Sequence, residues 1–147
     1  MLNDIFCSAR IKLNLEGATK TEVFKELIET FAESKSEFER CDMLEAVFQR
    51  ESKMNTIIRP GIAVPHGYCS SVRGIIGTIG FSRRGIKYDT LDSNPVHLFF
   101  MLLLDEYSWE GHLEVLSRLL KFLKSSSFPE IQGNEMPQEI FERLCCF

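Results

Sequence analysis

The feature that most constrains the fold is a run of nine residues, 96–104, that is apolar except for His97. The run is too short to cross a membrane as a helix, which takes roughly 20 residues. A strand that is apolar on both faces belongs in the middle of a sheet that is covered on both sides. We therefore expect this run to be a central strand, and we interpret His97 as a structural histidine within it.

Amphipathic helices are predicted on both sides of this strand. Two of them begin with Thr19 and Ser36, each followed three residues later by a glutamate, as in a capping box. The predicted helices cover residues 20–33, 37–52 and 110–124, with a last helix beginning at Pro137. The second helix is expected to bury the face formed by Phe38, Cys41, Leu44, Val47 and Phe48.

Shorter strands complete the predicted fold. They are expected at residues 11–15, 62–64, 74–82 and 86–88, the last two separated by a turn at Gly85. Strands in the middle of the chain and helices at both ends predict an α/β sandwich, with a mixed sheet flanked by helices. Because the 147 residues contain no repeat and no boundary signal, we expect one domain over residues 1–147.

Composition argues against several functional classes. Seventeen basic and 21 acidic residues give a net charge of -4, the opposite of the balance typical of a nucleic-acid binder. The N-terminus lacks a basic segment followed by an apolar stretch, so we expect a cytoplasmic protein without membrane insertion. Five cysteines without a C-x-x-C pair, and no metal-ligand spacing, predict reduced thiols and no metal or other cofactor.

Two histidines are candidates for chemistry. His66 stands between Pro65, whose ring fixes its own φ, and Gly67, which is expected to let the chain turn away. A histidine presented in this way is a plausible nucleophile or proton carrier. His112 lies in the first turn of a predicted helix, where free backbone N–H groups favour an anion, although a solvated histidine is equally ordinary there.

The most specific motif in the chain surrounds the first of these histidines. It reads Gly61-Ile62-Ala63-Val64-Pro65-His66-Gly67. Three further pairs agree with one family in order and spacing: Arg50-Glu51, Pro95-Val96 and His112-Leu113. From about residue 10 to residue 125, the chain resembles the enzyme IIA domains of the bacterial phosphoenolpyruvate-dependent phosphotransferase system, in the fructose/mannitol branch that includes the nitrogen-regulatory proteins.

The resemblance implies a site and a partner. His66 would accept a phosphoryl group from an HPr-like phosphocarrier, and His112 would stabilise that group. Arg50 and Thr56 would bind its oxygens. Arg59, which is not part of the family pattern, is either an additional phosphate-binding cation or a member of a surface ion pair. The group would then pass to a IIB domain, or the protein would act on a regulated target.

The phosphate loop departs from the family pattern. Ile57 and Arg59 stand where the family usually has glycine, and Pro60 has no backbone N–H to offer a phosphate. Two alternatives to a free-standing regulatory phosphocarrier therefore remain open. One is a IIA-like binding module that no longer accepts phosphate, and the other is a sugar-specific IIA that serves separate IIB and IIC chains.

Overall fold

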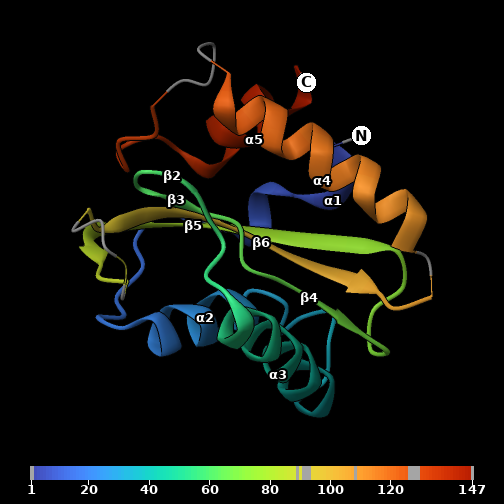
Figure 1. Cartoon of the computed structure of the whole chain (residues 1–147). Helices are drawn as coiled ribbons and strands as arrows, with labels where there is room; N and C mark the ends of the chain where they lie inside the picture. The colour runs from blue at the N-terminus through green and yellow to red at the C-terminus, as the bar shows by residue number, and fades with distance from the viewer. Residues whose placement is uncertain (1, 89, 91–93, 108, 126–129, 147) are drawn as a thin grey trace.

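The computed structural model shows one mixed sheet between two layers of helices (Figure 1). It describes residues 2–88, 90, 94–107, 109–125 and 130–146. The elements are α1 (Leu2–Ile5), a 3-10 turn (Ser8–Arg10), β1 (Ile11–Lys12), α2 (Lys20–Glu29), α3 (Glu37–Lys53), β2 (Ile57–Arg59), β3 (Ile62–Ala63), β4 (His66–Cys69), β5 (Ile75–Ile86), β6 (Val96–Asp105), α4 (Trp109–Lys124) and α5 (Pro137–Cys145).

Strand β6 is the centre of the sheet, as its apolar run predicts. It pairs antiparallel with β5 on one side and parallel with both β3 and β4 on the other, in the order β1-β5-β6-β3-β2. Because strand side chains alternate between faces, Phe100 and Leu102 enter one core and Phe99 and Met101 enter the other. The predicted α/β sandwich is therefore confirmed.

The two cores lie on opposite faces of the sheet. Helices α2 and α3 cover one face, and α1, α4 and α5 cover the other (Figure 1). Both predicted caps are present, since the Thr19 hydroxyl accepts from the Glu22 N–H and Ser36 and Glu39 form a reciprocal capping box. No helix within the described residues is both long and apolar enough to span a membrane.

The buried face of α3 agrees with the prediction only in part. Val47 is buried as predicted, and Leu44 and Phe48 are partly buried against the same core. Met43 and Glu51 are also buried, whereas Phe38 is 81% exposed and Cys41 is also exposed. Helical spacing places both sets on regular stripes, so periodicity alone could not decide between them. The sheet selects the stripe that fits beside β4.

Two shorter predictions are also corrected. Residues 74–82 and 86–88 do not form separate strands, because β5 runs from Ile75 to Ile86 with only a register shift after Phe81. Gly85 lies inside that strand at φ +81. Helix α2 ends at Glu29, earlier than predicted, and the Thr30 hydroxyl then donates to the Leu27 carbonyl.

Candidate functional site

Strand β4 and helix α3 meet at Gly67, and this contact positions the site. Gly67 lies within β4 and does not have positive φ, so the predicted turn away from His66 is wrong. Its role is steric, because a Cβ there would stand 2.6 Å from the backbone carbon of Ala46. The missing side chain lets α3 lie directly on β4 and brings the end of the helix to His66.

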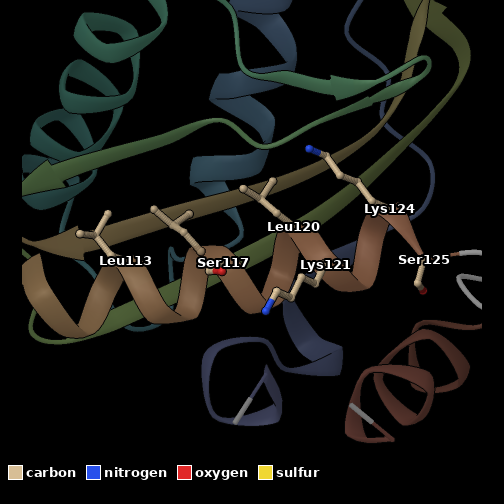
Figure 2. Close-up of a pocket in the computed structure, with 7 residues that line it drawn as sticks. Leu113, Ser117, Leu120, Lys121, Lys124 and Ser125 are labelled. Atoms are coloured by element: carbon tan, nitrogen blue, oxygen red, sulfur yellow. The ribbon is translucent and has the colours of Figure 1, made fainter.

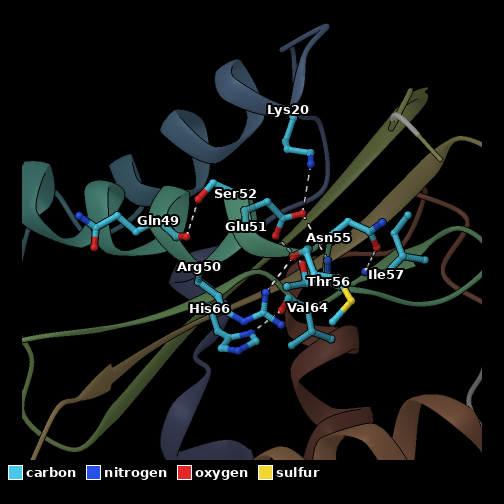
Figure 3. Close-up of polar contacts among 11 residues, drawn as sticks. Lys20, Gln49, Arg50, Glu51, Ser52, Asn55, Thr56, Ile57, Val64 and His66 are labelled. Atoms are coloured by element: carbon cyan, nitrogen blue, oxygen red, sulfur yellow. Dashed lines mark hydrogen bonds and ion pairs between the residues drawn. The ribbon is translucent and has the colours of Figure 1, made fainter.

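The backbone holds the His66 imidazole in one tautomer. Its Nδ1 lies 2.9 Å from the Val64 carbonyl oxygen, which can only accept, so Nδ1 carries the proton in the neutral ring (Figure 3). The lone pair is therefore on Nε2, the nitrogen that can act as a nucleophile. This acceptor is two residues upstream in the same segment.

Burial and charge favour the neutral form of this ring. Burial lowers the pKa of His66 from its ordinary value of 6.5, whereas the hydrogen bond to Val64 raises it. The nearby Arg50 guanidinium also lowers this pKa, and the Glu51 carboxylate raises it. The net shift is downward, so at neutral pH the imidazole is predominantly uncharged.

Arg50 reaches the imidazole from the last turns of α3. The close-up view shows its guanidinium next to His66 (Figure 3). One nitrogen, Nη1, donates to the Met54 carbonyl at 2.8 Å, which fixes the side chain across the helix end. A guanidinium has five N–H donors, so most of them remain available for an anion at Nε2 of His66.

Thr56 and Glu51 form a buried support beside these groups. The Thr56 hydroxyl donates to Glu51 Oε2 at 2.8 Å, and the Thr56 N–H donates to Oε1 at 3.3 Å. Lys20 neutralises the carboxylate from 3.2 Å. The hydroxyl proton of Thr56 is therefore already committed, and its carbonyl accepts from Val64 at 2.9 Å, which supports the segment that orients His66.

Glu51 is the residue that sequence reasoning undervalued. It is only 7% exposed although it carries a charge. A signal was present, because a glutamate in the last turn of a helix is disfavoured by the helix dipole. It also falls four residues after Val47, on the buried stripe of α3.

His112 approaches the site from the other helical layer. It is 3% exposed, and its Nδ1 has no hydrogen-bond partner among the described residues. Its ring lies against Tyr68, with centroids 5.8 Å apart. Tyr68 shares a face of β4 with His66, two residues away. Burial lowers the pKa of His112, and the Asp105 carboxylate opposes that shift.

Arg59 lies elsewhere in the structure. Its Nη1 donates to the Leu123 carbonyl at 2.7 Å, at the C-terminal end of α4. In the sheet Arg59 is level with Ile62 and hence with Leu98, whereas His66 is level with Leu102. Four residues of strand correspond to about 13 Å, so the structure does not bring Arg59 to the imidazole.

A shallow groove of about 580 Å³ runs along α4 beyond His112 (Figure 2). Its apolar wall includes Leu113, which is 53% exposed, together with Leu116 and Leu120. Lys121 and Lys124 form its basic end. An exposed leucine, with two partly buried leucines and a basic end beside it, suits contact with another protein.

Comparisons with known proteins identify the family. Residues 4–144 match the family described as phosphoenolpyruvate-dependent sugar phosphotransferase system, EIIA 2. The chain is 35% identical over 122 residues to the PTS system fructose-specific EIIABC component of Bacillus subtilis. That match covers 83% of this chain but only 19% of the longer relative.

Two nitrogen regulatory proteins match along nearly their full length. One, from Bradyrhizobium diazoefficiens, is 30% identical over 144 residues, covering 97% of this chain and 94% of the relative. The other is the crystal structure of the nitrogen regulatory protein IIA-Ntr from Neisseria meningitidis, with a TM-score of 0.84 and 28% identity. That alignment covers 97% of this chain and 98% of the other.

Proposed function

Because this chain belongs to the EIIA 2 family of the phosphoenolpyruvate-dependent sugar phosphotransferase system, we propose that His66 is its phosphoryl acceptor. The observation that carries this assignment is the hydrogen bond from Nδ1 to the Val64 carbonyl, which leaves the Nε2 lone pair free beside Arg50. The donor in this proposal is an HPr-like phosphocarrier protein.

The transfer needs no proton movement at His66. The Nε2 lone pair forms a bond to phosphorus while the bond from phosphorus to the donor breaks. Nδ1 keeps its proton, and the Val64 carbonyl stabilises the positive charge that develops on the ring. Phosphoryl transfer asks the protein mainly for positioning and for neutralisation of charge, and the described residues offer both.

Arg50 and His112 are the proposed phosphate-binding groups. The free N–H groups of Arg50 can bind two phosphoryl oxygens together, a geometry that suits a planar guanidinium. The Nδ1 of His112 is buried and has no partner in the part of the chain that the structure describes, and its ring contacts the ring of Tyr68. We assign Thr56 a positioning role, because its hydroxyl proton is already donated to Glu51.

The groove on α4 supports contact with protein partners. It begins at Leu113, next to His112 in the chain, and combines this exposed leucine with Lys121 and Lys124 (Figure 2). We propose that the phosphocarrier, and then a IIB domain or a regulated target, contacts this groove during transfer in the cytoplasm. The EIIABC name of the Bacillus subtilis relative is consistent with an acceptor of the IIB type.

A regulatory role is the favoured physiological setting. Its support is the match to a nitrogen regulatory protein over 97% of this chain and 94% of the relative. A sugar-specific IIA that serves separate IIB and IIC chains is the second candidate, supported by the 35% identity to the fructose-specific component. Both candidates require the same chemistry at His66.

Intact-mass measurement tests the assignment. The chain is incubated with phosphoenolpyruvate, enzyme I and HPr, and wild type should gain one phosphoryl group that is labile to acid and stable to alkali. His66→Gln should gain none. Arg50→Gln should be labelled roughly 100- to 1000-fold more slowly, as expected for the loss of one charged donor in the transition state.

The exposed Arg84, on β5, provides the matched control, and Arg84→Gln should be labelled at the wild-type rate. Acid-stable label on serine or threonine, or full labelling of His66→Gln, contradicts the assignment. A wild-type chain that stays unlabelled beside an active IIA control would favour the non-catalytic binding module.

A further inference from the structure

Another pocket, with polar side chains in its wall, lies at the end of the sheet opposite to His66. It encloses about 400 Å³ between the β2–β3 hairpin, the facing parts of β5 and β6, and residues 130–132. Its wall contains Arg59, Arg83 and His97, three side chains that come from three different strands. Arg59 is also one of the residues that depart from the family motif, so the pocket includes a feature that the phosphoryl site does not use.

Both arginines retain unused hydrogen-bonding capacity. Arg59 donates to the Leu123 carbonyl at 2.7 Å, and Arg83 donates to the Gly133 carbonyl at 3.3 Å. Neither guanidinium forms an ion pair with a carboxylate in the described part of the chain. Glu130 is also on the wall, but it forms no ion pair with either arginine in the described structure. The wall therefore carries two guanidinium charges and one carboxylate, which leaves it a net positive charge.

His97 and its neighbours provide a planar, apolar surface. The His97 Nδ1 lies 2.7 Å from the Ser82 carbonyl oxygen, which leaves Nε2 without that partner. The imidazole stacks on Phe81 at an interplanar angle of 26°. Gly85 packs against the edge of the ring that carries Nε2, since a Cβ there would stand 2.8 Å from Cε1 and 3.0 Å from Nε2. Ile131 adds a further apolar side chain to the wall.

This pocket is separate from the phosphoryl site. His66 pairs with Leu102 on β6, five residues after His97. Five residues of strand correspond to roughly 17 Å. The β3 segment connects the two places, because Gly61 lines the pocket and the same chain continues to Val64 and His66.

We propose that this pocket binds a small organic anion, a carboxylate or a phosphate joined to a planar apolar group. The two guanidinium groups recognise the anionic end, which they can bind in the paired geometry of charge-assisted hydrogen bonds. The stacked rings and Ile131 hold the apolar part. An inorganic anion alone would use only half of this surface, and a neutral aromatic molecule would leave the charges unpaired.

The test is a titration of the ¹⁵N-labelled full-length protein, in which binding is monitored through the amide chemical shifts. The probes are phenyl phosphate, benzoate, inorganic phosphate and benzyl alcohol. We expect saturable shifts that centre on residues 59, 61–62, 81–83, 97–98 and 130–132 with phenyl phosphate or benzoate. Whichever of these two probes binds more tightly identifies the preferred anionic group. Both should bind more tightly than inorganic phosphate or benzyl alcohol.

Variants assign the binding to this pocket. Arg83→Gln and Arg59→Gln should each weaken phenyl phosphate or benzoate binding by about tenfold or more, the loss expected for a hydrogen bond to a charged group. Arg84→Gln is the matched control, because Arg84 is exposed like its neighbour Arg83 but is not part of the pocket wall. Arg50→Gln should also leave the binding unchanged.

Three outcomes would overturn the proposal. The first is that no organic anion produces saturable shifts. The second is that the shifts centre on Arg50 and His66 and disappear in Arg50→Gln. The third is that Arg84→Gln weakens binding as much as Arg83→Gln, which would indicate general attraction to a basic surface. The spectrum of each variant shows directly whether it is folded, and phosphorylation of His66 does not enter the measurement.

Discussion

At the scale of single residues, the surroundings of His66 select both its tautomer and its charge. The Val64 carbonyl assigns the proton to Nδ1, while burial and Arg50 lower the pKa of the ring from 6.5. The uncharged ring is the form that can attack phosphorus. Phosphorylation should therefore continue as the pH falls through 6.5 and decline only at more acidic pH.

The Arg50→Gln variant tests the cause of that shift. Removing the guanidinium removes a charge that lowers the pKa of His66, so the pKa should rise and the acidic decline in labelling should move to higher pH. The pKa is measured from the imidazole proton resonances in wild type and variant, with Arg84→Gln as control. A pKa that is unchanged in Arg50→Gln would show that Arg50 does not act on the imidazole.

Thr56 provides a second prediction at this scale. Thr56→Val keeps the shape of the side chain but removes the donor to Glu51, a carboxylate that is 7% exposed. We expect the free energy of unfolding to fall by about 1–3 kcal/mol, measured by urea denaturation. Thr56→Ser, which retains the hydroxyl, should lose less. Equal losses in the two variants would contradict the importance of this hydrogen bond.

At the scale of secondary-structure elements, the approach of α3 to β4 determines whether Arg50 reaches His66. Gly67→Ala would place a Cβ 2.6 Å from the Ala46 backbone, which cannot move aside as a flexible side chain can. Overpacking of this kind costs roughly 1–3 kcal/mol of stability. The variant should also be phosphorylated more slowly, because α3 would shift away from β4 and move Arg50 away from His66.

Gly111→Ala is the matched control for this substitution. Gly111 is in helix α4, and a Cβ there would meet nothing within 4 Å. Alanine should therefore stabilise the protein by up to about 1 kcal/mol through helix propensity. Thermal unfolding and the labelling rate check both variants. A Gly67→Ala protein with wild-type stability and labelling rate would contradict the proposed role of the contact.

At the scale of the whole molecule, β6 joins the two cores into one structure. Phe99 and Phe100 are both fully buried, but they point into opposite cores. Each substitution by alanine should cost about 3–5 kcal/mol. Because both cores share β6, we expect either variant to reduce hydrogen-exchange protection in α3 and α4 together. Loss confined to α3 in Phe99→Ala and to α4 in Phe100→Ala would instead indicate two independent units.

Features that depend on neighbours in the chain could be predicted from the amino-acid sequence. The apolar run around residue 100 predicted the central strand, and the caps at Thr19 and Ser36 predicted where two helices begin. The motif that ends in His66 predicted the family. These signals are local, because caps, periodicity and motif spacing all act over a few residues.

The tertiary structure alone decided which distant residues meet. Two stripes of α3 have helical spacing and share Val47, and packing on the sheet buries Met43 fully while Phe38 stays exposed. The register of the sheet put Arg59 level with Leu98, far from His66 along β6. The absence of a side chain at Gly67 matters only because Ala46 approaches it. Such contacts depend on how whole elements pack, and no short stretch of sequence contains that information.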